Sequence, residues 1–159
     1  KVSKTAMAVA ALLVLATGCG TTYLEGTEIE DTPDSRAIYD VVEAYRLAVE
    51  QRDVTTLMQL ISPRYFENAS TTAVDSDDYG YEALRERVLP LLQDNIKAVQ
   101  LRLRLTRIEI RGERAHADYE FWMKFLYAEG GREGWRAKND FNRLEFVRED
   151  DRWKISGGL

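Results

Sequence analysis

The chain changes its hydrophobic period once, and this change limits the folds open to it. Between residues 34 and 99, apart from a polar stretch at 67–78, apolar residues recur at intervals of three and four, the period of helices with one buried face. Between residues 101 and 156, apolar and polar residues alternate, the period of half-buried strands. Helices that precede strands, instead of alternating with them, indicate an α+β fold rather than a parallel α/β fold.

The first part of the helical region predicts two helices. The first begins near residue 34, where Asp34 or Ser35 can cap it. Its predicted inner face carries Ile38, Val41, Val42, Tyr45, Ala48 and Val49. Asp53 can cap a second, shorter helix that ends at Ser62-Pro63.

A third helix is predicted to begin near Tyr79, after a polar loop at residues 67–78. Its apolar face continues to Val99 across Pro90. Because proline lacks a backbone donor and clashes with the preceding turn, we expect it to kink or split this helix.

The remaining sequence predicts four antiparallel strands in a meander. The apolar residues change phase after Leu105, so a bulge is expected near Thr106-Arg107. Turns are expected at residues 111–113, at 129–132 with Gly130-Gly131, and at 149–152. The predicted fold is therefore α+β, with three N-terminal helices packed on an antiparallel sheet of about four strands.

Composition excludes several classes of function. The 159 residues are 45% hydrophobic and 31% charged, which suits one globular domain with a core. Asp and Glu outnumber Lys and Arg by 27 to 22, so the sequence shows no basic footprint for nucleic acid. The single cysteine excludes an internal disulfide. One cysteine and one histidine are also too few ligands for a zinc cluster of Cys and His. Without a phosphate-binding, nucleophile-elbow or metalloprotease motif, we expect no metal and no cofactor.

The N-terminal residues have the pattern of a targeting segment. Lys1 and Lys4 precede an apolar run at residues 6–16, which is too short to cross a bilayer comfortably. Small residues then lead to Cys19. The stretch from Leu15 to Cys19 resembles the lipobox of bacterial lipoproteins; the alternative is a short hydrophobic anchor with an incidental thiol.

The lipobox resemblance implies a cell-envelope lipoprotein. Residues 1–18 would be a cleaved signal peptide, Cys19 would carry the acyl chains that bind the membrane, and residues 19–33 would be an acidic linker to a domain at 34–159. Several acyl chains anchor a protein stably, whereas one does so only marginally. Gly20 is not the aspartate that retains lipoproteins in the inner membrane, so the resemblance favours the outer membrane. If flexible, the linker would act as a tether.

The order of elements also has a familiar form. A first helix running into Gln51-Arg52-Asp53 and a chain ending in Asp151-Arg152-Trp153-Lys154-Ile155 resemble the NTF2-like superfamily, of the SnoaL and ketosteroid-isomerase type. The resemblance implies a curved sheet that wraps the long helix and leaves a conical pocket. The superfamily includes isomerases, cyclases and dehydratases as well as binding modules, so the resemblance does not decide activity.

Tyr45 matches the position of the hydrogen-bonding tyrosine of the ketosteroid isomerases, although it also suits the core. The general base of that family would fall at Ala69, between Asn68 and Ser70, and none of these side chains can abstract a carbon-bound proton near neutral pH. Glu67 could serve only if the loop alignment shifts by two residues. The resemblance therefore implies a domain without the family's base.

A candidate pocket follows from the phase of the third strand. If Leu144 and Phe146 point into the cone, the same phase turns Asp140 and Asn142 inward. The candidate pocket residues are Tyr45, Tyr119, Trp135, Asp140, Asn142 and Trp153. The alternative is that these aromatic residues fill the cone as core. His116 is expected on the outer face with Asp118 and Glu120, where Arg102 and Arg104 can pair with the two acids.

These observations favour a binding or interaction module over an enzyme, and they assign no catalytic residue. Its partner would be a small apolar ligand in the cone or a protein on the sheet. The enzymatic alternative is a dehydratase or isomerase that uses Asp140 as acid/base and Tyr45 as hydrogen-bond donor. A third alternative is a structural protein with a filled cone. The superfamily often dimerises through the sheet, so a homodimer is also open.

Overall fold

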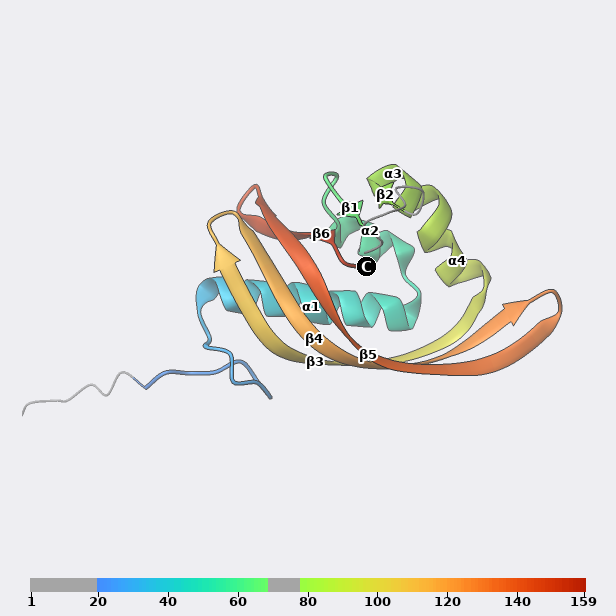
Figure 1. Cartoon of the computed structure of the whole chain (residues 1–159), viewed down its shortest axis with the longest axis horizontal. Helices are drawn as coiled ribbons and strands as arrows, with labels where there is room; N and C mark the ends of the chain where they lie inside the picture. The colour runs from blue at the N-terminus through green and yellow to red at the C-terminus, as the bar shows by residue number, and fades with distance from the viewer. Residues whose placement is uncertain (1–19, 69–77) are drawn as a thin grey trace, which may run out of the picture.

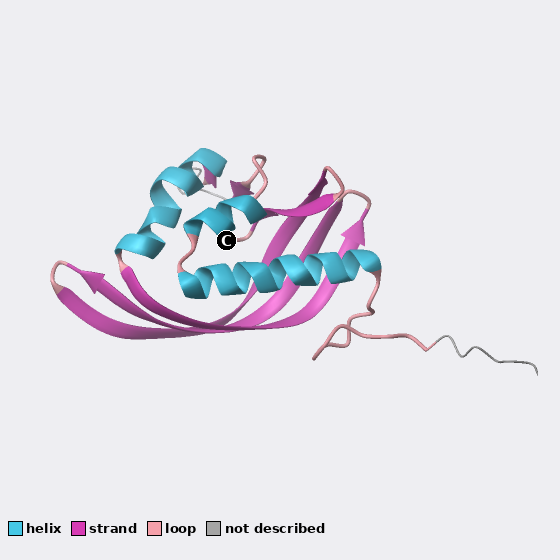
Figure 2. Cartoon of the chain, turned by 180° about the vertical axis from the view of Figure 1, so that it is seen from behind, coloured by secondary structure: helices cyan, strands magenta, loops and turns pink. Residues whose placement is uncertain are grey.

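The computed structural model describes residues 20–68 and 78–159, in which the helices lie within a bowl formed by a curved sheet (Figures 1 and 2). In chain order the elements are α1 (Pro33–Gln51), α2 (Val54–Leu60), β1 (Phe66–Glu67), β2 (Tyr79–Gly80), α3 (Tyr81–Ala83), the π-helical turn η2 (Leu84–Val88), α4 (Leu89–Asp94), β3 (Ile96–Arg111), β4 (Arg114–Glu129), β5 (Arg132–Glu149) and β6 (Arg152–Gly157). The main sheet has the antiparallel order β3-β4-β5-β6, and β1 pairs with β2. The predicted α+β fold is confirmed.

The N-cap of helix α1 lies two or three residues before the predicted caps. Thr32 is the N-cap, and its hydroxyl accepts the backbone N–H of Ser35 while the Ser35 hydroxyl accepts that of Thr32. Pro33 occupies the first turn, where its missing donor costs nothing. The prediction of Asp34 or Ser35 as cap was therefore wrong, although Ser35 takes part in the capping box. The inner face of α1 is as predicted, with Ile38, Val42 and Ala48 buried.

Helix α2 has the predicted cap, because Asp53 accepts a hydrogen bond from the Thr56 backbone at 3.0 Å. The third helical region is broken next to Pro90, where the π-helical turn η2 gives way to α4. It ends at Asp94, so the prediction of helix as far as Val99 was wrong. Residues 96–99 belong to β3, where pairing with β4 satisfies their backbone groups.

The register of the sheet fixes two faces. On the concave face, which α1 covers, Ala115, Ala117 and Tyr119 of β4 are buried. On the convex face, the alternate residues of β4 begin with His116 and Asp118. The predicted bulge lies between Leu105 and Arg107 and brings Ile108 back to the concave side.

The β4–β5 turn contains Gly130 and Gly131, both with positive φ, as a tight hairpin requires. Beyond the bend of the sheet, this hairpin extends past the end of α1 (Figure 1). The concave face is therefore covered by helices over one part of its length and less covered toward the hairpin.

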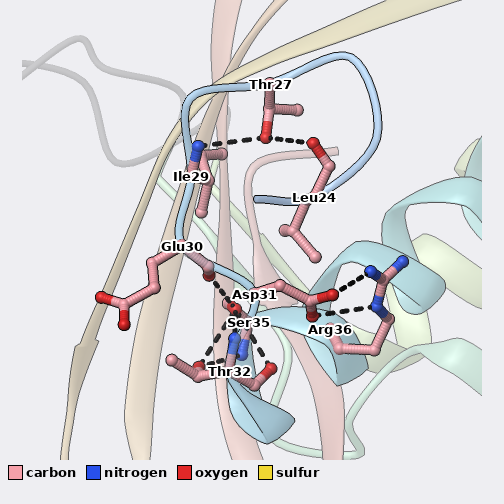
Figure 3. Close-up of polar contacts among 8 residues, drawn as sticks. All are labelled: Leu24, Thr27, Ile29, Glu30, Asp31, Thr32, Ser35 and Arg36. Atoms are coloured by element: carbon pink, nitrogen blue, oxygen red, sulfur yellow. Dashed lines mark hydrogen bonds and ion pairs between the residues drawn. The ribbon is translucent and has the colours of Figure 1, made fainter. Parts of the chain in front are cut away.

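The segment before α1 is folded against the domain. Tyr23 and Glu30 form an antiparallel bridge, and the turn between them is closed by a bond from the Leu24 amide to the Ile29 carbonyl at 2.9 Å. Leu24 is 1% exposed. Thr27 stabilises the turn through its hydroxyl (Figure 3). The described part of the expected tether is thus a packed hairpin, because Leu24 and Ile29 provide it with apolar contacts.

Two further properties bear on function. Within residues 20–68 and 78–159, no helix is long and apolar enough to cross a membrane. Over the same residues, no group of three or more His, Cys, Asp and Glu side chains is arranged to hold a metal ion.

Candidate functional site

Three polar side chains meet on the concave face beneath α1. Tyr45 comes from α1, Tyr119 from β4 and Asn142 from β5, where Asn142 is the direct register partner of Tyr119. The Asn142 amide nitrogen donates to the Tyr119 hydroxyl at 3.2 Å and to the Gly158 carbonyl at 3.1 Å. Tyr45 makes a polar contact with the same Tyr119 hydroxyl. We call Tyr45, Tyr119 and Asn142 the tyrosine–amide group.

A second polar set adjoins this group through the end of the chain. The Tyr65 hydroxyl donates to Glu67 Oε2 at 2.7 Å, and the Gly158 amide donates to the same oxygen at 2.7 Å. The Leu159 amide donates to the Tyr65 hydroxyl at 3.2 Å. Gly158 therefore links the two sets, because its carbonyl contacts Asn142 and its amide contacts Glu67.

Burial keeps the tyrosines of this region protonated. It raises the pKa of the Tyr45 hydroxyl, and the contact with Tyr119 raises that pKa further. Burial also raises the pKa of Tyr119, although the contacts with Asn142 and Tyr45 act in the opposite direction. For Tyr65, burial and the bond to Glu67 both raise the pKa. These hydroxyls are therefore neutral hydrogen-bond donors at physiological pH, not bases.

The Tyr119 hydroxyl is the chemically distinctive member of the tyrosine–amide group. It accepts from the Asn142 amide, so its own proton is left to donate. A buried hydroxyl that still has a proton to donate can bind the oxygen of a ligand that reaches it. The arrangement can therefore orient a carbonyl or hydroxyl oxygen without charge.

A groove large enough for a ligand lies further along the sheet, and no residue of the tyrosine–amide group lines it. It measures about 890 Å³ beside the C-terminal end of α1, and its lining combines concave-face residues such as Leu101 and Met123 with convex-face residues such as Trp122. Phe121 lies between Tyr119 and Met123 on the same face of β4, and its ring centroid is 6.2 Å from that of Tyr119. An apolar row therefore runs from the buried hydroxyl into the groove.

The other predicted pocket residues are spread more widely. Asp140 shares the face of Asn142, but its side chain is 55% exposed and lies 3.6 Å from the Lys138 ammonium. Trp153 is buried in the core, where its indole N–H donates to Asp34 at 3.3 Å. Trp135 is the register partner of Leu126 and lies on the convex face, 47% exposed. The structure thus brings together Tyr45, Tyr119 and Asn142, and it separates Trp135 and Trp153 from them.

The convex face carries the charge pairs. His116 lies there as predicted, with its Nε2 atom 3.6 Å from the Glu109 carboxylate. Arg104 pairs with Glu120, as predicted. Asp118 instead pairs with Arg143 at 2.6 Å, because Arg143 is its direct register partner.

Sequence reasoning gave Glu67 only a conditional role and did not include Tyr65. Their contacts depend on the final two residues of the chain, which are remote in sequence, so no local motif indicates them. Of the other predicted sites, Cys19, Ala69 and Ser70 lie outside the described residues.

The comparisons with known proteins agree with this geometry. The fold and its concave site define an α+β cone of the NTF2-like class. Residues 38–157 match the SnoaL-like domain family, and the chain belongs to that family. The comparison with curated proteins gave no match.

Solved structures show the same fold at low sequence identity. A conserved protein from Planctomyces limnophilus is 16% identical with a TM-score of 0.63, covering 79% of this chain and 92% of its own. An NTF2-like superfamily protein from Salmonella enterica serovar Typhimurium is 15% identical with a TM-score of 0.63, covering 79% and 89%. A hexachlorocyclohexane dehydrochlorinase is 17% identical with a TM-score of 0.57, covering 79% and 84%. These likenesses show the shared fold.

Proposed function

We propose that the domain binds a small, neutral, largely apolar molecule on its concave face, with one ligand oxygen hydrogen bonded to Tyr119. The observation that carries the proposal is the Tyr119 hydroxyl, which accepts a hydrogen bond from Asn142 and keeps its own proton for a further acceptor. The apolar row of Phe121 and Met123 provides the surface for the rest of the ligand.

The proposal can be tested with two probes that differ by one oxygen. 2-Acetylnaphthalene has a carbonyl acceptor, and 2-ethylnaphthalene has the same shape without it. We expect the purified full chain to bind the ketone about tenfold more tightly in a fluorescence titration, because a donor left unpaired in a buried site costs about 1–3 kcal/mol. Tyr119→Phe should abolish this preference, and Tyr23→Phe, which alters an exposed tyrosine, should retain it. Equal affinities for the two probes in the unaltered protein would overturn the proposal.

The alternative is an enzyme that moves a proton next to a carbonyl group, and Glu67 is the observation that favours it. The hydrogen bonds that Tyr65 and Gly158 give to this carboxylate both fall on Oε2, and a carboxylate can accept a proton on its other oxygen. A dehydrochlorinase shares the fold, which supports the alternative only as an analogy. Asp140 with Tyr45 is the less favoured pair, because Asp140 is exposed and lies beside Lys138.

The enzymatic alternative predicts catalysed deuterium exchange at the methyl group of 2-acetylnaphthalene in D2O. Glu67→Gln should reduce the exchange to the buffer rate, and Asp140→Asn should leave it unchanged. Exchange at the buffer rate with the unaltered protein would exclude this activity toward simple ketones.

A second role, as an interaction surface, is supported by aromatic residues on the convex face. Trp122, Trp135 and Phe141 are 41%, 47% and 71% exposed, and the register places all three on this face. Exposed apolar patches of this kind mark interaction sites. If the partner is a second copy, sedimentation velocity should show a dimer that Phe141→Ser weakens, while Leu47→Ser on α1 leaves it intact.

We also propose that acylated Cys19 anchors the chain in the cell envelope, with the outer membrane as the favoured location. The support is the sequence pattern of Lys1, Lys4, the apolar run at 6–16 and the small residues before the cysteine. Intact-mass measurement of the membrane fraction should show a chain that begins at Cys19 and carries acyl mass. A membrane-bound chain without acyl mass would contradict the proposal, and Cys19→Ala is the control.

A further inference from the structure

The convex face has a cavity that the proposed ligand site does not use. It measures about 390 Å³ and lies where the segment leading into β1 meets strands β3, β4 and β5. Its lining includes Arg64, Phe66, Arg111, Arg114, His116 and Arg143. From this set of side chains we infer that the cavity is a second binding site, which takes a small organic phosphate.

The charge of the cavity is unusual for this chain. Four arginines line it, against the two carboxylates Glu109 and Glu145, although the chain as a whole has a net charge of −5. Three of the four arginines have a carboxylate partner, since Arg64 pairs with Glu149, Arg111 with Glu109 and Arg143 with Asp118. Among the described residues Arg114 has none, so the lining keeps one guanidinium whose charge is not balanced by a pair and can attract an anion.

Two of these arginines are direct neighbours. Arg111 and Arg114 are register partners at the β3–β4 turn, and like charges in directly opposed positions destabilise a sheet. Among the described residues, Arg114 has no ion pair. A phosphate between the two guanidinium groups would relieve their repulsion and accept paired N–H bonds from the planar groups.

His116 adds a second, independent indication. His116 lines the cavity, and its buried Nε2 atom, 3.6 Å from the Glu109 carboxylate, has no hydrogen-bond partner among the described residues. Buried polar atoms are usually paired, and an unpaired one indicates a missing partner. A phosphate oxygen can accept from a protonated His116, and the ester oxygen can accept from the neutral ring.

Apolar surface in the cavity indicates that the phosphate carries an organic group. Phe66 is 56% exposed at the rim, and Val147 is 9% exposed in the lining even though it lies on the convex face. An aromatic or alkyl substituent can cover both side chains. We therefore expect a phosphate monoester to bind more tightly than inorganic phosphate.

The test is isothermal titration of the full chain with phenyl phosphate and with inorganic phosphate at low ionic strength. Phenyl phosphate should bind at least several-fold more tightly, and Phe66→Ala should remove that difference. The double variant Arg111→Ala/Arg114→Ala should weaken phenyl phosphate at least tenfold. The matched double variant Arg85→Ala/Arg87→Ala, which removes two exposed arginines from the third helical region, should leave it unchanged.

Three results would overturn the inference. These are undetectable binding of phenyl phosphate, equal loss in the two double variants, and equal affinity for the ester and inorganic phosphate. Arg111→Lys/Arg114→Lys is the control for misfolding of the double alanine variant. It keeps both positive charges and should retain part of the affinity for phenyl phosphate. None of these results depends on the concave site, whose probes are uncharged.

Discussion

Asn142 donates from one amide nitrogen to the Tyr119 hydroxyl at 3.2 Å and to the Gly158 carbonyl at 3.1 Å. The first bond joins neighbouring strands, and the second holds the end of the chain against β5. The concave site is therefore assembled from the sheet and the C-terminal residues together. Its geometry should be sensitive to changes at either place.

Asn142→Ala should destabilise the domain by about 1–2 kcal/mol, since it leaves the Gly158 carbonyl and the Tyr119 hydroxyl without this donor. Urea unfolding followed by tryptophan fluorescence measures the change. Asn139→Ala is the matched control, because Asn139 lies on the same strand but faces the convex side opposite Trp122. Equal loss in the two variants would show that the Asn142 bonds contribute nothing specific.

Gly158→Ala should be more damaging. Gly158 has a φ of +88°, and a Cβ atom there would lie 1.9 Å from the Arg143 carbonyl oxygen. The terminal residues would have to move, which would break the bond from the Gly158 amide to Glu67. We expect a loss of about 2–4 kcal/mol in urea unfolding and faster hydrogen exchange at Leu159.

Gly131→Ala distinguishes the two causes of the loss expected for Gly158→Ala, which are the positive φ and the contact of the added Cβ atom with Arg143. Gly131 also has a positive φ, at +75°, but no atom lies within 4 Å of its added Cβ. It should therefore show only the backbone cost of about 1 kcal/mol. If Gly158→Ala cost no more than Gly131→Ala, the close contact with Arg143 would be irrelevant.

Much of the fold follows from local pattern. The inner face of α1, the Asp53 cap, the bulge after Leu105 and the hairpin at Gly130-Gly131 are all encoded by nearby residues. The end of the third helix is not encoded by nearby residues, because Ile96 and Val99 fit both a helical and a strand pattern. Pairing with β4 decides between the two, and such pairing cannot be read from a local window.

The positions of the site residues were predictable only where the period of a single strand or helix determines which face a side chain occupies. Strand alternation places Tyr119 and Asn142 on one face, and helical spacing adds Tyr45. The same alternation places Trp135 and Asp140 on opposite faces, since they are five positions apart on one strand. Glu67 joins the site through the Gly158 amide, a contact between distant parts of the chain that no motif indicates.

Stability should fall steeply in alkali. Burial raises the pKa of Tyr45, Tyr65, Tyr79 and Tyr119 above the ordinary value near 10. Below pH 10 both the folded and the unfolded chain keep these protons, so stability is unaffected. Above pH 10 the unfolded chain loses protons that the folded chain retains. The free energy of unfolding should then decrease by up to about 1.4 kcal/mol per pH unit for each such tyrosine.

Urea unfolding at pH 8, 9, 10, 10.5 and 11 measures this dependence. Tyr119→Phe should reduce the decrease in the free energy of unfolding with pH by the contribution of one buried tyrosine. Tyr23→Phe, at an exposed position, should leave that decrease unchanged. A slope that is identical in all three proteins would mean that Tyr119 ionises equally readily when folded.

The start of α1 offers a last test, because one serine hydroxyl both accepts and donates a hydrogen bond there (Figure 3). Ser35 is 4% exposed, accepts the Thr32 amide at 2.8 Å and donates to the Glu30 carbonyl at 2.6 Å. Ser35→Ala removes these bonds while it keeps the helix, so unfolding should become easier by about 1–2 kcal/mol. Hydrogen exchange at the Leu24 amide should also become faster, because Glu30 holds the N-terminal hairpin to α1. Thr55→Ala, at an exposed position in α2, should change neither quantity, and equal effects of the two substitutions would contradict a specific role for Ser35.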